Sequence, residues 1–259
     1  MEGIFQSLKG KVIIVVGTGG IGGAIVKDFL KQGCKVFALD KNQKTLQRLG
    51  IKKNLKKIIV DVTEKKRYKE VLENIGKKYK PIKSFIYTAG IATPTPVDNF
   101  IDGLPEKLFD INVVGFIYGV KYIVPFMEKG SSIIVISSIN AYRSEYQMTV
   151  YDSTKAALIQ YAKTAAIELG KKGIRVNVVA PGYIRTPQTI QELKNPLTRR
   201  IIERATALGR IGEPEDVSSV VVVLCSDDFK FVTGAVVEVS GGLALAQYPP
   251  IKKQFYYKF

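Results

Sequence analysis

The sequence of 259 residues contains no histidine and no tryptophan, and it has only two cysteines. Without histidine, a Ser–His–Asp nucleophile, a histidine proton shuttle and the common catalytic zinc sites are all excluded. Cys34 and Cys225 lie far apart and form no metal-binding or redox motif, so we expect buried thiols and no metal site. Acid/base chemistry must therefore come from Tyr, Lys, Asp or Glu.

The sequence also lacks an uninterrupted apolar run long enough to cross a bilayer, since stretches such as Val217 to Cys225 are too short. The N-terminus lacks the charged-then-apolar pattern of a secretory signal. We therefore expect a cytoplasmic protein with no membrane partner. An apolar share of 46% is ample for a large core, and the length suits one α/β domain spanning residues 1–259.

Acidic residues are scarce relative to basic ones, which gives a net charge of +16. The lysines are densest between Lys41 and Lys83, where they alternate with glutamates and apolar residues, as on solvated helices. No aromatic–basic array or nucleic-acid motif accompanies them, so we expect a basic surface rather than a nucleic-acid partner. A nucleic-acid-binding protein is the alternative, and a gel shift at moderate salt would test it.

Short apolar segments alternate with helical patterns along the whole chain. We predict strands at Lys11–Val16, Lys35–Leu39, Lys57–Val60, Ser84–Tyr87, Ser131–Ser137, Arg175–Val179 and Ala235–Val239. We predict helices at Ile21–Leu30, Lys65–Lys78, Glu106–Met127, Tyr151–Leu169 and Pro214–Cys225. This alternation predicts an α/β fold with a Rossmann-like, doubly wound, mostly parallel seven-stranded sheet and helices on both faces.

A glycine-rich turn separates the first predicted strand from the first predicted helix. It reads Gly17-Thr18-Gly19-Gly20-Ile21-Gly22, and strand, G-x-G-x-x-G and helix together point backbone N–H groups at a pyrophosphate. Asp40 ends the second strand eighteen residues after Gly22, where an acidic side chain can bind a ribose 2′-hydroxyl. An ordinary glycine turn is the alternative, but the context favours a nucleotide site. The candidate residues are Gly17, Gly19, Gly20, Ile21, Gly22 and Asp40.

A tyrosine and a lysine stand four apart at the start of a predicted helix, as Tyr151 and Lys155. They share a helix face, and a nearby ammonium favours the phenolate form of a tyrosine. Ser138 ends a strand thirteen residues before Tyr151, so its hydroxyl is expected in the same crevice. A surface Tyr–Lys pair at helical spacing is the alternative interpretation.

With these motifs the chain resembles the short-chain dehydrogenase/reductase family over nearly its whole length. The matching residues are the Gly17–Gly22 turn, Asp61-Val62, Thr88-Ala89-Gly90, Asn112, Ser138, Tyr151, Lys155, Pro181-Gly182, Thr186, and the ending from Phe231-Val232-Thr233-Gly234 to Ser240-Gly241-Gly242. The resemblance implies a nicotinamide-dependent oxidoreductase that interconverts an alcohol and a carbonyl compound.

The resemblance also implies roles for the catalytic residues. Tyr151 would exchange a proton with the substrate oxygen, and Lys155 would lower the pKa of Tyr151 and hold the nicotinamide ribose. Ser138 would hydrogen-bond the carbonyl oxygen. Asn112 would hold a water that links Lys155 to solvent, with a helix kink or cap as the alternative role for its side chain.

Further cofactor contacts are implied in the same way. Asp61 and Val62 would border the adenine, Ala89 and Gly90 would lie beneath the cofactor, Ile184 and Thr186 would contact the carboxamide end, and Pro181 is a further cofactor residue. Asp40 predicts NAD(H) rather than NADP(H), because its charge would repel a 2′-phosphate. The chain departs from the family pattern in several places. The glycine turn is one residue shorter than usual, Val16 replaces a threonine, Tyr87-Thr88 replaces a pair of asparagines, and Ser240 replaces the aspartate before the last two glycines.

The substrate is not specified by these motifs. We expect Ser138, Asn140, Arg143 and Tyr151 to contact it. Arg143 would pair with an acidic substrate such as a hydroxy acid, with an exposed arginine as the alternative. Residues 183–208 follow a strand with a looser pattern and are expected to form a substrate lid. The alternatives are a 3-oxoacyl thioester reductase and an inactive nucleotide-binding sensor or scaffold. From the resemblance and the apolar segments near its end, we expect a homo-oligomer, and specifically a tetramer.

Overall fold

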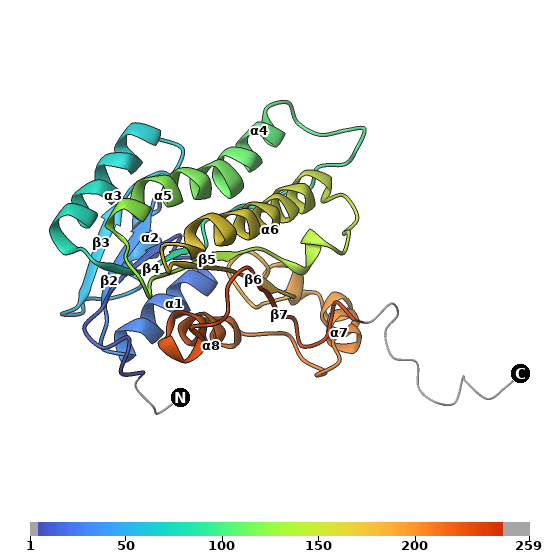
Figure 1. Cartoon of the computed structure of the whole chain (residues 1–259). Helices are drawn as coiled ribbons and strands as arrows, with labels where there is room; N and C mark the ends of the chain where they lie inside the picture. Colours follow the sequence, from blue (N-terminus) through green and yellow to red (C-terminus); the bar gives the residue numbers. More distant parts are fainter. Residues whose placement is uncertain (1–4, 246–259) are drawn as a thin grey trace, which may run out of the picture.

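A sheet of seven strands, all parallel, runs through the centre of the protein (Figure 1). The computed structural model describes residues 5–245, so the predicted domain of residues 1–259 extends beyond this range at both ends. The strand order is β3-β2-β1-β4-β5-β6-β7. The strands are β1 Val12–Val16, β2 Lys35–Asp40, β3 Leu55–Ile59, β4 Ile82–Tyr87, β5 Ser132–Ile136, β6 Arg175–Pro181 and β7 Val236–Val239.

The fold class and all seven predicted strands are confirmed, and no strand end shifts by more than two residues. Every residue of β4, β5 and β6 is buried because helices cover both faces of the sheet. The edge strands β3 and β7 are only partly covered, and the two central lysines of β3 are exposed. Charged side chains of this kind discourage pairing with another sheet edge.

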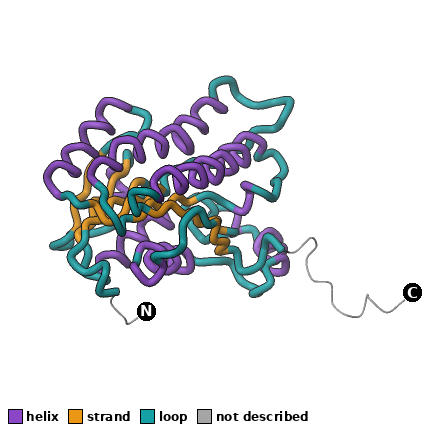
Figure 2. The backbone as a smooth tube through the Cα atoms, viewed as in Figure 1, coloured by secondary structure: helices purple, strands orange, loops and turns teal. Residues whose placement is uncertain are grey.

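Helices cover the two faces of the sheet in separate groups (Figures 1 and 2). One face packs against α1 (Gly20–Lys31) and α8 (Pro214–Cys225), which also pack extensively against each other. The other face packs against α3 (Lys65–Tyr79), α5 (Gly115–Ile123) and α6 (Thr149–Gly170). The short helix α2 (Gln43–Gln47) contacts β2 and β3. This arrangement leaves the carboxyl edge of the sheet open between the helix ends.

A long apolar helix covers the middle of the second face. It consists of α4 (Leu104–Phe109), a π-helical turn at Asp110–Val114, α5 and a short 3₁₀ turn at Val124–Phe126. By length and a mean hydropathy of 1.3 it meets the requirements for a membrane span. Its apolar side packs within the protein: a Cβ at Gly119 would lie 2.6 Å from Phe85 and from Tyr68. Packing against the sheet and α3 therefore accounts for its hydrophobicity.

The predicted lid contains two short helical elements. A 3₁₀ turn at Glu192–Lys194 is followed by α7 (Pro196–Ala205), and Asn195 caps α7 through its side chain. No residue of α7 is buried, and Leu197 and Ile201 are exposed. Apart from the buried Ile184, Leu193 and Thr206, the segment that follows β6 is half-buried or exposed.

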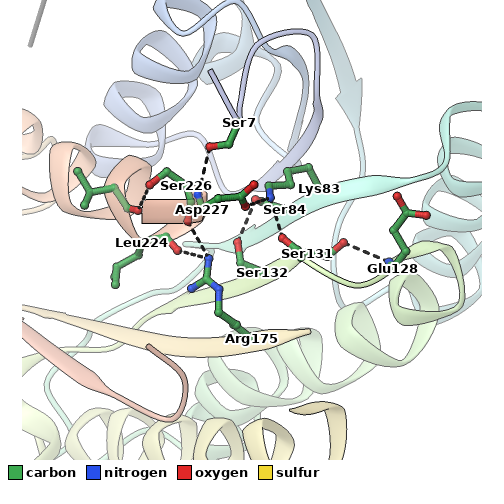
Figure 3. Close-up of polar contacts among 12 residues, drawn as sticks. Ser7, Lys83, Ser84, Glu128, Ser131, Ser132, Arg175, Leu224, Ser226 and Asp227 are labelled. Atoms are coloured by element: carbon green, nitrogen blue, oxygen red, sulfur yellow. Dashed lines mark hydrogen bonds and ion pairs between the residues drawn. The ribbon is translucent and has the colours of Figure 1, made fainter. Parts of the chain in front are cut away.

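The opposite, amino edge of the sheet holds a buried polar cluster (Figure 3). Lys83 at the start of β4 donates to the carbonyl of Gly130 and pairs with Asp227 at 2.6 Å. Arg175 at the start of β6 donates to the carbonyls of Leu224 and Ser226 at the end of α8. Both cations are fully engaged in holding α8 and its following turn to the sheet. They are structural, and the functional chemistry lies at the other edge.

Candidate active site

The glycine turn joins β1 to α1 at the point where the strand order reverses between β1 and β4. Gly17 has a φ of +85°, and a Cβ there would lie 2.5 Å from the amide nitrogen of Ala89. The side chain of Thr88 donates to the carbonyl of Gly17 at 2.5 Å. By contrast, a Cβ at Gly19 would meet nothing within 4 Å. The turn is thus packed tightly against the loop after β4 but open toward the cleft, as a phosphate cradle requires.

A cleft of about 700 Å³ extends from this turn along the carboxyl edge of the sheet. Its walls include eleven predicted cofactor residues: Gly17, Gly19, Gly20, Ile21, Gly22, Asp40, Asp61, Val62, Ala89, Gly90 and Thr186. The volume and the open glycine turn fit a dinucleotide. Pro181 and Ile184 do not line the cleft. Pro181 is buried at the end of β6, and Ile184 is buried and bridged to Gly212.

The end of β2 is tied directly to the glycine turn. Asp40 accepts hydrogen bonds from the backbone nitrogen and the hydroxyl of Thr18 at 2.7 and 3.0 Å, and from the backbone nitrogen of Asn42 at 2.8 Å. The neighbouring Lys41 extends to Asp61, with its nitrogen 3.5 Å from the carboxylate. Burial raises the pKa of Asp61, but the hydrogen bonds from Thr63 and the charge of Lys41 outweigh it and hold this pKa below its usual value.

Tyr151, Lys155 and Ser138 come together beside the cleft. Tyr151 and Lys155 lie one turn apart near the start of α6, and the Lys155 nitrogen lies 5.5 Å from the centre of the Tyr151 ring. This nitrogen donates to the carbonyl of Ile136 at the end of β5, at 3.1 Å. Ser138 follows two residues later, and it is close enough to Tyr151 to lower the pKa of the phenol. The three predicted catalytic groups therefore share one crevice.

Burial shifts the pKa values of both Tyr151 and Lys155. Burial raises the pKa of Tyr151 to about 12, against the lowering influence of Ser138, and the nearby Glu145 and Asp152 raise it further. Burial lowers the pKa of Lys155 to about 8. Desolvation of the phenolate is the largest influence on Tyr151. The predicted lowering of the Tyr151 pKa by the charge of Lys155 stays a prediction.

Asn112 lies in the π-helical turn between α4 and α5. Its side-chain oxygen accepts from the backbone nitrogen of Ile91 at 2.9 Å, and its side-chain nitrogen donates to the carbonyl of Ile91 and to Thr154, both at 3.0 Å. A Cβ at Gly90 would lie 3.3 Å from the Asn112 oxygen and 3.6 Å from the Lys155 nitrogen. Asn112 therefore occupies a helix irregularity and also joins the loop after β4 to α6. Its role in holding a water stays a prediction.

The predicted substrate residues lie in the loop between β5 and α6. The side chain of Asn140 faces Ser138, Glu145 and Asp152. Arg143 instead donates to the carbonyl of Leu243, so its guanidinium is engaged by the C-terminal loop. This contact gives no support to a role for Arg143 in binding an acidic substrate.

Sequence reasoning overlooked several polar residues at the site. Thr18 lies inside the predicted glycine motif, and Asp152 lies between Tyr151 and Lys155, but neither belongs to the pattern that was recognised. Lys27 and Arg48 also line the cleft. Tyr183 and Glu192 of the lid bond each other. No local sequence pattern marks these residues, because their positions at the site depend on segments that only the fold brings together.

Comparisons with known proteins agree with this geometry. A family model described as enoyl-(acyl carrier protein) reductase matches residues 15–244. The 3-oxoacyl-[acyl-carrier-protein] reductase of Thermotoga maritima is 32% identical over 246 residues, covering 92% of this chain and 99% of the relative. The NADP-dependent (R)-specific alcohol dehydrogenase of Lentilactobacillus kefiri is 32% identical over 245 residues, covering 91% of this chain and 97% of the relative.

Solved structures show the same likeness. The ligand-free aldohexose dehydrogenase of Thermoplasma acidophilum superposes with a TM-score of 0.87 and 30% identity, covering 96% of this chain and 99% of that structure. The match of the family, the relatives and the fold therefore extends over almost the whole chain. The chain belongs to the short-chain dehydrogenase/reductase family, whose members are oxidoreductases that use a nicotinamide cofactor to interconvert alcohols and carbonyl compounds.

Proposed function

We propose that Tyr151 is the proton donor and acceptor of this oxidoreductase, with Ser138 and Lys155 as its partners. The observation that carries the proposal is the position of the three groups: Ser138 is close enough to the Tyr151 phenol to lower its pKa, and the Lys155 nitrogen lies 5.5 Å from the tyrosine ring. A carbonyl oxygen between the two hydroxyls would accept a hydrogen bond from each. When bound in the adjoining cleft, a nicotinamide supplies or accepts the hydride.

In carbonyl reduction, Tyr151 donates its proton to the substrate oxygen while Ser138 stabilises the negative charge that develops there. A pKa of about 12 keeps Tyr151 protonated at neutral pH, which suits this direction. In alcohol oxidation, the same oxygen must lose a proton to Tyr151, so the phenolate form is required. Lys155, anchored to the carbonyl of Ile136 at 3.1 Å, is placed to stabilise that phenolate and to hold the nicotinamide ribose.

The cofactor proposed here is NAD(H) in preference to NADP(H). Asp40 lines the cleft, and three hydrogen bonds fix its carboxylate in place. A 2′-phosphate would meet this charge, and two unit charges 4 Å apart repel by about 1 kcal/mol even in water. The next residue in the chain, Lys41, is directed to Asp61. The NADP-dependent relative from Lentilactobacillus kefiri makes this preference a point to measure.

Members of the family are commonly oligomeric, and a homotetramer is proposed for this chain. The helix α8 does not support this proposal, because Val217, Val221 and Val222 are buried against its own core. Better support comes from β7, an edge strand with one neighbour and a mostly half-buried surface, and from Ile167 on α6, which is 76% exposed. Light scattering at micromolar concentration tests it, and a monomer would contradict it.

A panel of alcohols and ketones, followed by cofactor absorbance, tests the catalytic proposal. Tyr151→Phe should reduce turnover of every substrate by about 10²–10⁴-fold, as expected for loss of a general acid/base, while cofactor binding is retained. Tyr118→Phe, on α5 and outside the lining of the cleft, is the matched control and should leave turnover unchanged. Turnover that survives Tyr151→Phe would contradict the assignment. Preferred reduction of 3-oxoacyl thioesters would instead support the alternative activity.

A further inference from the structure

Carboxylates gather at the mouth of the catalytic crevice, although the chain carries a net charge of +16. Glu145 and Asp152 are close enough to Tyr151 to raise the pKa of its phenol, beyond the effect of burial. Burial, Glu192 and Glu145 likewise raise the pKa of Tyr183, whose hydroxyl donates to Glu192 on the lid. Acidic side chains from the loop after β5, from α6 and from the lid thus surround the approach to the two tyrosines.

Asn140 holds two of these carboxylates in place. Its side-chain nitrogen donates to Glu145 at 2.7 Å and to Asp152 at 2.9 Å, and the backbone nitrogen of Glu145 donates to the second oxygen of Asp152 at 2.9 Å. Only the NH₂ group of an amide can serve two carboxylates, so the Asn140 oxygen faces Ser138, at 3.4 Å from its hydroxyl. The carboxylates are therefore fixed beside the serine that would receive the substrate oxygen.

Basic side chains do not neutralise these carboxylates. Within residues 5–245, no Lys or Arg nitrogen lies within 4.0 Å of Glu145, Asp152 or Glu192. Arg143 is directed to the carbonyl of Leu243. The amino end of α6, which would otherwise attract an anion, carries Asp152 in its first turn. The crevice mouth therefore offers hydrogen-bond acceptors and negative charge, with no cation paired to them.

We propose that the substrate is a neutral polyhydroxylated compound, a sugar or polyol, and that Glu145 and Asp152 accept hydrogen bonds from hydroxyls near its reacting carbon. This inference rests on the function proposed above, in which Ser138 and Tyr151 receive the reacting oxygen. A hydroxylated substrate donates to the free lone pairs of the carboxylates. The carboxylates repel an anionic substrate, and an apolar substrate offers no donor to their free lone pairs. A thioester on an acidic carrier is disfavoured for the same reason.

Matched sugars that differ by one carboxylate provide the test. The pairs D-glucose with D-glucuronate and D-galactose with D-galacturonate share the reacting anomeric carbon. With oxidised cofactor, kcat/KM for the preferred aldose should exceed that for its uronate by about tenfold or more, the effect of roughly 1.4 kcal/mol. Acetoacetyl thioester with reduced cofactor and cyclohexanol with oxidised cofactor complete the panel and should be poorer substrates.

Variants at Glu145 connect this preference to the carboxylate. Glu145→Gln should raise KM for the aldose several-fold with little change in kcat, and it should narrow the gap between aldose and uronate. Glu145→Lys should reverse the order of the pair. The matched control is Glu168→Gln, at the exposed far end of α6, which should change neither value. Cofactor affinity should be unaltered in all three variants, because none of the residues lines the cofactor cleft. Melting temperatures show how much stability each Glu145 variant loses with the 2.7 Å bond from Asn140.

The outcomes separate this inference from the proposed function. The preferred substrate could instead be a uronate, a thioester or cyclohexanol, with turnover that Tyr151→Phe abolishes. That result would overturn the sugar assignment and leave the catalytic proposal standing. Equal effects of Glu145→Gln and Glu168→Gln would also overturn it. Failure to turn over any compound of the panel, or turnover that persists in Tyr151→Phe, would count against both proposals.

Discussion

The carboxylate of Asp40 at the end of β2 accepts hydrogen bonds from both the backbone nitrogen and the hydroxyl of Thr18, at 2.7 and 3.0 Å. Thr18 lies inside the glycine turn, between Gly17 and Gly19. One side chain therefore links the phosphate cradle to the part of the cleft expected to bind the adenine ribose. The two hydrogen bonds also fix the position of the glycine turn, which is one residue shorter than is usual in this family.

Removing the charge of Asp40 should weaken the preference for NAD(H). In Asp40→Asn, the amide oxygen still accepts from Thr18. The NH₂ group cannot accept the 2.8 Å hydrogen bond that the backbone nitrogen of Asn42 donates to Asp40 in the native protein, so that bond is lost. We expect the ratio of kcat/KM for NAD to that for NADP to fall about fivefold or more, because a repulsion of roughly 1 kcal/mol disappears. Steady-state kinetics with both cofactors measures this ratio.

Thr18→Val is the matched control for the cofactor ratio. It removes the hydroxyl bond of 3.0 Å but keeps the backbone bond and the Asp40 charge. It should lower stability by about 1 kcal/mol, as is typical for one hydrogen bond, and leave the cofactor ratio unchanged. A native enzyme that prefers NADP, or an Asp40→Asn variant with the native ratio, would contradict the role given to Asp40.

Gly19→Ala should impair cofactor binding without impairing folding. Gly19 has a φ of −60°, which alanine adopts freely, and its added Cβ would meet no atom within 4 Å. As the N-cap of α1 it should lose less than about 1 kcal/mol of stability. The methyl group would project into the open cradle and hold a phosphate away, so the cofactor Kd should rise about tenfold or more. Fluorescence titration and thermal unfolding measure the two effects separately.

The control for Gly19→Ala is Gly170→Ala. Gly170 is also unobstructed within 4 Å, but it ends α6 at the far side of the sheet from the cleft. It should leave the cofactor Kd unchanged. If both variants bind the cofactor as the native protein does, the glycine turn does not hold the phosphates.

The order and type of the main elements could be predicted because each has a local cause. Strands such as β1 and β5 are short β-branched runs that must be buried on both faces, and α8 was predicted with the correct bounds because Pro214 can start a helix. The glycine turn and the Tyr151–Lys155 spacing are also local patterns. These signals were sufficient for the fold class, and most of the residues that they indicated for the cofactor line one cleft.

Contacts between distant segments could not be predicted in this way. The π-helical turn at Asn112 depends on hydrogen bonds to Ile91, twenty-one residues earlier in the chain. The direction of the Tyr151 pKa shift depends on how deeply the fold buries the phenol and on Glu145 and Asp152. Helix α7 was expected only as part of a loosely patterned lid, because none of its residues is buried to give a clear period.

Oxidation and reduction should depend differently on pH. Tyr151, with a pKa of about 12, is protonated across the neutral range, so reduction should change little with pH between about 7 and 9 through this group. Alcohol oxidation requires the phenolate, whose fraction rises about tenfold for each pH unit below the pKa. We therefore expect kcat/KM for oxidation to rise up to at least about pH 10. A plateau below about pH 9 would show that Lys155, and not burial, controls the phenol in the working enzyme.

The buried Lys155 should make the stability of the protein depend on pH between about 8 and 10.5. Its pKa falls from 10.5 to about 8 on folding because burial disfavours the ammonium form. Below pH 8 both the folded and unfolded states are protonated, and the buried charge reduces stability. As the pH rises toward 10.5, the folded lysine becomes neutral while the unfolded one still binds a proton, so the unfolded state binds more protons and stability increases. Above 10.5 this contribution is complete.

Lys155→Met removes this titration and preserves the length of the side chain. Each pKa unit corresponds to 1.36 kcal/mol, so the native protein should gain up to about 3 kcal/mol relative to Lys155→Met between pH 7.5 and 10. The unmade hydrogen bond to the carbonyl of Ile136 affects the variant at every pH and does not alter this difference. Urea unfolding at both pH values measures it, with Lys163→Met, exposed on the same helix, as the control. If the two methionine variants show the same pH dependence, Lys155 is not a desolvated ammonium in the folded protein, and its proposed role in stabilising the Tyr151 phenolate loses its electrostatic basis.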